Sequence, residues 1–135
     1  MVDDLEVVRL ECDPGVVCQT DIGFGGPGSM AITMCGQPLS TGNTASLDVT
    51  GAPPGGLVFL IGGVFNNPTP FEGGTLVPIP ILVTIARVAD AGGAVSLGVP
   101  GGGGPVTVYV QAAAADGGVP GGYRISNALE CDVLP

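Results

Sequence analysis

The sequence predicts an all-β fold, a single β-sandwich of about seven strands with Ig-like or jelly-roll wiring and an N-terminal extension strand. Its 135 residues suit one domain, and 25 glycines and 13 prolines divide them into short segments. Those segments are apolar, and several alternate apolar with polar residues, as half-buried strands do. No segment has a convincing helical period. Short apolar runs at regular spacing between turn residues are typical of a sandwich.

The chain divides into an N-terminal extension, residues 1–22, and a sandwich domain, residues 23–135. The extension contains the segment LEVVRLEC and is followed by the glycine-rich GFGGPG. LEVVRLEC is predicted to form a strand. Because a short apolar strand beside a glycine hinge can add to a neighbour's sheet edge, the predicted assembly residues are Leu5, Val7, Val8 and Leu10.

The first half of the sandwich domain contains three predicted strands and one long loop. MAITMC (30–35) and TASLDVTG (44–51) alternate apolar with polar residues, which indicates strands with one buried face. LVFLIGG (57–63) is continuously apolar, as a central strand covered on both faces would be. The segment 64–74 is predicted to be an exposed loop.

The second half contains four more predicted strands. Residues 75–89 form one long strand whose first half lies at a sheet edge or bends, because Pro78 and Pro80 cannot donate to a ladder. DAGG (90–93) is a hairpin turn. The strands 94–99, 106–115 and 123–133 follow, and VTVYVQA alternates strictly.

The four cysteines, Cys12, Cys18, Cys35 and Cys131, predict two disulfides, no free thiol and an oxidising compartment. The preferred pairing is Cys12–Cys18, across an Asp-Pro-Gly turn, with Cys35–Cys131; three connectivities are open. An all-cysteine zinc site is the rival interpretation, but no CxxC pair is present. The chain shows no signal peptide, so a secreted protein would correspond to the mature chain.

The composition excludes several classes of function. The net charge of −9, with three Lys or Arg in all, argues against nucleic acid and anionic membranes as partners. Without histidine or lysine, the familiar nucleophile-and-base arrangements are impossible, so no enzyme activity and no cofactor are expected. The acidic ends could converge on calcium, although the sequence contains no recognisable calcium-binding motif. Thr69, between two prolines, is a possible O-glycan site.

Four motifs together carry a family resemblance that covers roughly residues 23–129. They are GAPPGGLVFLIGG (51–63), DAGG (90–93), YVQA (109–112) and ISNAL (125–129). In this order they resemble a glycine-rich β-sandwich module found in secreted and cell-surface proteins of environmental bacteria. The resemblance implies a secreted sandwich and supplies no catalytic residues. The N-terminal extension has no counterpart in that module, so a special function is expected there.

We therefore expect a non-catalytic extracellular or cell-surface subunit that assembles head to tail into a fibre or surface layer by N-terminal strand addition. The alternative is a secreted binding module that recognises carbohydrate or a surface protein through segment 64–74. Such a module would use exposed aromatic side chains, and the available ones are Phe65, Phe71, Tyr109 and Tyr123.

Overall fold

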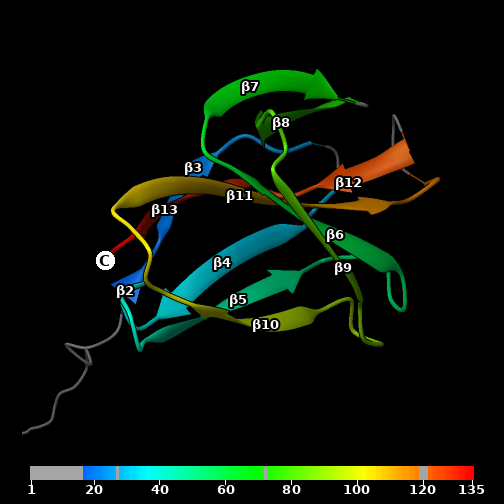
Figure 1. The fold of residues 1–135 in the computed structure, drawn as a ribbon. Coiled ribbons are helices and arrows are strands. Elements are labelled where there is room, and N and C mark those ends of the chain that lie inside the picture. The colour runs from blue at the N-terminus through cyan, green and yellow to red at the C-terminus, as the bar shows by residue number, and fades with distance from the viewer. Residues whose placement is uncertain (1–16, 27, 72, 119–121) are drawn as a thin grey trace, which may run out of the picture.

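Two antiparallel sheets face each other in the computed structural model, which describes residues 17–26, 28–71, 73–118 and 122–135 (Figure 1). The predicted all-β fold is confirmed. The four-stranded sheet has the order β10–β5–β4–β2, and its strands are β2 (Val17–Cys18), β4 (Ala31–Gly36), β5 (Thr44–Thr50) and β10 (Val95–Pro100).

The second sheet has the order β3–β13–β11–β6–β9, and β12 also pairs with β11. Its strands are β3 (Thr20–Gly23), β6 (Leu57–Gly63), β9 (Val83–Val88), β11 (Val106–Ala115), β12 (Tyr123–Ile125) and β13 (Ala128–Val133). The tetrapeptide LECD occurs twice, at residues 10–13 and 129–132. The second copy lies in β13, whereas the first lies outside the described part of the chain.

The main core lies between these two sheets. Each sheet contributes the apolar face of its alternating strands, so Ile32 and Val49 meet Val58, Ala112 and Leu129. The alternation predicted for residues 30–35 and 44–51 is confirmed, because every second side chain of β4 and β5 is buried. β6 lies between β11 and β9, as its continuous apolar sequence predicts.

A hairpin of β7 (Asn66–Phe71) and β8 (Gly74–Pro78) covers part of the outer face of the six-stranded sheet (Figure 1). The prediction of a loop over 64–74 was therefore wrong. The predicted long strand 75–89 is divided into β8 and β9, with a bend at 79–82 that agrees with the expected effect of Pro78 and Pro80. A second apolar cluster, under the hairpin, contains Ile61, Leu76, Ala113 and Ile125.

Gln111 attaches this hairpin to the sheet. Its side chain is fully buried, and its Oε1 accepts a hydrogen bond of 2.9 Å from the Val77 backbone N–H in β8. Its Nε2 donates to the Thr75 and Ser126 carbonyl oxygens at 2.8 and 2.9 Å. The alternation of β11 places Gln111 on the outer face of the sheet. Its side chain is buried there because the hairpin covers that face.

No helix long and apolar enough to cross a membrane occurs in the described residues.

Candidate assembly interface

One side of the sandwich is closed by residues 17–23, which cross from one sheet to the other. β2 pairs with β4 at the edge of the four-stranded sheet, and β3 pairs with β13 at the edge of the six-stranded sheet. Between them, the Gln19 N–H donates to the Met34 carbonyl at 2.8 Å. Residues 17–22 of the predicted extension are therefore paired within the sandwich, and LEVVRLEC lies outside the described residues.

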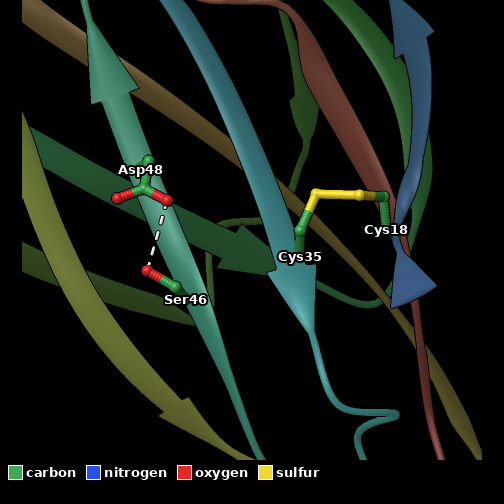
Figure 2. Close-up of a disulfide and its surroundings, with 4 residues drawn as sticks. All are labelled: Cys18, Cys35, Ser46 and Asp48. Carbon is green, nitrogen blue, oxygen red and sulfur yellow. Dashed lines mark hydrogen bonds between the residues drawn. A yellow bond between two sulfur atoms is a disulfide. The ribbon is translucent and has the colours of Figure 1, made fainter. Parts of the chain in front are cut away.

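A disulfide fastens this closing segment to the sheet. Cys18 in β2 lies directly opposite Cys35 in β4, and their sulfur atoms are bonded (Figure 2). The preferred pairing of Cys12 with Cys18 and of Cys35 with Cys131 was wrong. The physical reason is the antiparallel register of β2 and β4, which brings the Cys18 and Cys35 Cα atoms to 4.0 Å. Cys12 lies outside the described residues.

Among the described residues, Cys131 is buried and has no disulfide partner, whereas the sequence predicts a bond between Cys35 and Cys131. Burial raises the pKa of Cys131 to about 12, and the nearby Asp132 and Glu130 charges act in the same direction. The thiolate is the reactive form of cysteine. Cys131 is therefore protonated and shielded in the folded protein.

We expect Cys131 to resist alkylation until the protein unfolds. In a Cys12→Ser variant at about pH 8, iodoacetamide should leave the native chain unlabelled and should label a single thiol in guanidinium chloride, as intact mass spectrometry would show. The variant removes the other cysteine that the structure does not place in a disulfide. Rapid labelling of the native variant would contradict the burial of Cys131.

The opposite side of the sandwich is open. Among the described residues, β9 pairs with β6 alone and β10 with β5 alone. These two edge strands belong to different sheets, and a short turn around Asp90–Gly93 joins them (Figure 1). Two free strand edges therefore lie on the side away from β2 and β3.

An apolar groove lies between the two sheets on this open side. It holds a cavity of about 160 Å³, and all of its lining residues are apolar. The edge strands contribute Val83 and Ile85 from β9 and Leu97 and Val99 from β10. An apolar cavity of this size is large enough to hold a small apolar group, so the groove could receive an aliphatic side chain.

The outer edge of β9 presents backbone groups that pair with no strand of the described residues. The Ala89 N–H donates to the Gly56 carbonyl, and the ladder continues with Arg87 opposite Val58 and Ile85 opposite Leu60. Alternate residues of an antiparallel strand direct their backbone groups to opposite sides. Thr84, Ala86 and Val88 therefore direct theirs away from β6, and the Arg87 side chain donates to the Ala86 carbonyl at 2.9 Å.

Arg87 stands on the groove-facing side of β9. It has the same parity as Val83 and Ile85, which line the groove, and it lies opposite the buried core residue Val58. Its side chain is nevertheless exposed. Among the described residues, the structure pairs it with no carboxylate. An arginine with this orientation on an edge strand discourages the addition of an unmatched apolar strand.

The remaining predicted residues fall into three groups. The assembly residues Leu5, Val7, Val8 and Leu10 lie outside the described part of the chain. Thr69 is half-buried in β7, where its hydroxyl donates to the Asn67 carbonyl at 2.9 Å. The structure brings together no group of three or more His, Cys, Asp or Glu side chains within the residues it describes.

The candidate aromatic residues for a sugar site do not form one surface. Phe71 and Tyr123 pack against each other, with ring centroids 5.4 Å apart, and both pack against the second apolar cluster. Tyr109 is half-buried in β11. Phe65, with 59% of its surface exposed, is the most accessible of the four.

Two polar contacts connect distant segments and were not found from the sequence. The Asn127 side chain bonds both backbone groups of Ile32 in β4, at 2.8 and 3.1 Å. Arg124 donates to the Gly51 carbonyl at 2.6 Å and to the Asp116 carboxylate at 2.5 Å. These bonds need the tertiary fold and leave no local sequence signal.

The pKa of Asp116 is lowered from its ordinary value of 3.8, mainly by the hydrogen bond from the Gly118 N–H and then by Arg124. Since the folded pKa is the lower one, its contribution to stability is present above the ordinary value and is lost as the pH falls through the folded pKa. The carboxylate of Asp116 is therefore a structural group that accepts hydrogen bonds from the Gly118 N–H and from Arg124 of β12.

The fold and the groove define this chain as an all-β, two-sheet sandwich that is closed on one side and open to an apolar groove on the other. Comparisons with protein-family models, with curated proteins and with solved structures found no match.

Proposed function

We propose that this protein is a non-catalytic extracellular structural subunit that assembles head to tail by N-terminal strand addition. The observation that carries the proposal is the placement of two features on opposite sides of the sandwich. Val17, the first described residue after the N-terminal segment, lies on the closed side. The apolar groove with its free strand edges lies on the open side.

This placement favours a chain of subunits over a closed pair. Residues 1–16 join the sandwich at β2, and the edges that could accept a strand are β9 and β10, at the other end of each sheet. A contact between two different surfaces of identical subunits repeats as a filament unless the rotation closes a ring. A strand added at an edge would supply ladder hydrogen bonds as well as apolar side chains.

An extracellular location is supported by two observations. The Cys18–Cys35 disulfide is of a kind that persists in oxidising compartments. The sequence motifs at 51–63 and 90–93 resemble those of secreted and cell-surface proteins. A surface subunit that polymerises also fits a chain whose sequence has no histidine or lysine for catalysis.

Deleting residues 1–11 should abolish self-association while leaving the sandwich folded, because the described sheets and their core begin at Val17. Sedimentation velocity and electron microscopy of the purified full chain and the truncated chain measure the assembly, and thermal unfolding checks the fold. Deletion of residues 2–4 alone is the matched control, because it shortens the terminus but keeps LEVVRLEC.

The control truncation should assemble like the full chain. If the chain lacking residues 1–11 forms the same oligomers as the full chain, or if the full chain stays monomeric at every concentration, strand addition is not the function. The alternative of a carbohydrate-binding module has the exposed Phe65 in its favour. Of the other three candidate rings, Phe71 and Tyr123 pack on each other and Tyr109 is half-buried, so the four do not form one exposed aromatic surface.

A further inference from the structure

We infer that residues 5–11 of one copy bind along β9 of the next copy as an antiparallel strand, in the register that places Glu6 opposite Arg87. This inference rests on the proposed function and names its acceptor. It concerns the free edge of β9 and the groove beside it. The contacts of the two strands follow from the register, because residues of an antiparallel pair that lie opposite each other share a face.

β9 is the better acceptor of the two open edges. Its sequence, VTIARV, contains no proline, and Val83 and Val88 are 50% and 69% exposed. β10 ends at Pro100 and includes Gly98, and both residue types weaken strand pairing. An exposed apolar edge without proline is a template for another strand.

The register fills the groove with the apolar residues of the extension. With Glu6 opposite Arg87, Val8 lies opposite Ile85 and Leu10 lies opposite Val83. Val83 and Ile85 line the apolar cavity, so the two added side chains point toward it. Burying an aliphatic side chain of this size contributes about 1.5–3 kcal/mol, and this free energy favours binding of the added strand.

The other face of the added strand is apolar as well. In the same register Leu5 lies opposite Val88, and Val7 lies opposite Ala86. Val88 itself pairs with Leu57 of β6, and Leu57 is 47% exposed. Leu5 and Val7 would therefore cover exposed apolar surface on the outer face of the sheet, which accounts for apolar residues on both sides of LEVVRLEC.

Charge selects the register. Arg87 lies on the groove side of β9, so a strand that is added there without an opposite charge would place an apolar side chain over the guanidinium group. Glu6 has the same parity as Val8 and Leu10, so one strand presents a carboxylate and two aliphatic side chains to the matching positions of β9. Opposite charges directly across two strands stabilise the pair, and like charges destabilise it.

The acceptor belongs to a second copy because the extension is short. Leu10 precedes Val17 by seven residues, which reach at most about 25 Å when fully extended. Three strand spacings, about 14 Å in all, separate β2 from β10 in the four-stranded sheet. The six-stranded sheet, which contains β9, lies about 10 Å from it. These two distances add to about 24 Å, so the extension would reach β9 of its own molecule only when fully stretched, with no length left to pass around the side chains of the sandwich.

The test is charge reversal in the full-length chain. Glu6→Arg and Arg87→Glu should each weaken assembly about tenfold or more in apparent Kd, measured by sedimentation velocity. The double variant should regain most of the loss. An equimolar mixture of the two single variants should also assemble, because each extension then meets an opposite charge on the other variant's β9.

The matched controls make the same changes in charge at residues of the extension whose side chains lie on its other face. Arg9→Glu and Glu11→Arg alter the net charge as the test variants do, but their side chains face away from the groove in this register. They should assemble within about twofold of the unchanged chain. Because Arg87 is exposed and the other substituted positions precede the described sheets, which begin at Val17, the unfolding midpoints of all variants should agree.

The outcomes separate this inference from the proposed function. Recovery in the double variant and in the mixture supports the register. If removal of residues 1–11 abolishes assembly but the reversals at Glu6 and Arg87 act no more strongly than their controls, strand addition stands and the site on β9 is wrong. If the truncated chain assembles normally, the proposed function itself fails.

Discussion

Replacing Gln111 by leucine should lower the free energy of unfolding by about 4 kcal/mol, because three backbone groups in the interior lose their partner. The Gln111 side chain accepts from the Val77 N–H and donates to the Thr75 and Ser126 carbonyls. Leucine keeps most of the volume, so the loss reports the unpaired polar groups more than a cavity. Denaturant unfolding monitored by circular dichroism measures it.

The matched control is Gln37→Leu. Gln37 is exposed, and its side chain accepts a single hydrogen bond of 3.0 Å from the Thr44 N–H, so its loss should stay within about 1 kcal/mol. Hydrogen exchange gives a local measurement, since the Val77 amide should exchange faster in the Gln111 variant. Equal losses in the two variants would show that Gln111 does not hold the β7–β8 hairpin in place.

Gly93→Ala should also destabilise the fold, by about 3 kcal/mol or more. Gly93 has a φ of 77°, in the left-handed region, and an added Cβ would lie 2.1 Å from the Ala52 carbonyl oxygen. The Gly93 carbonyl meanwhile accepts from the Ala52 N–H at 3.0 Å, so neither backbone segment can move without loss. Thermal unfolding gives the change in Tm.

Gly55→Ala separates the two causes. Gly55 also has a left-handed backbone, with a φ of 69°, but an added Cβ meets nothing within 4 Å. Gly55→Ala should therefore lower the free energy of unfolding only by the cost of the left-handed conformation, about 1–2 kcal/mol. If Gly93→Ala is no worse than Gly55→Ala, the close approach of the β9–β10 turn to Ala52 does not limit this position.

The fold class and most strands could be predicted from the sequence, because strand formation leaves a local pattern. Alternation at 44–51 and 106–112 reflects which side chains face the core, and DAGG marks the turn before β10. The apolar segment LEVVRLEC suggested a donor strand. Neither the acceptor edge nor the groove could be predicted, because both arise from two edge strands of different sheets.

The cysteine pairing shows where local reasoning fails. The Asp-Pro-Gly turn suggested Cys12–Cys18, whereas the structure bonds Cys18 to Cys35 across β2 and β4. A disulfide requires its Cα atoms to be close, and strand register decides that distance. The burial of the Cys131 thiol likewise depends on both sheets, because this side chain of β13 belongs to the core between them.

By itself the sequence determined the all-β class, the turns and the faces of the longest strands, since each depends on residues near one another in the chain. The tertiary structure alone decided the division of 75–89 into β8 and β9, the burial of Gln111 beneath the hairpin, and the open side between β9 and β10. The physical reason is that side-chain periodicity records which residues are buried, while strand order and register are set by contacts between segments far apart in the sequence.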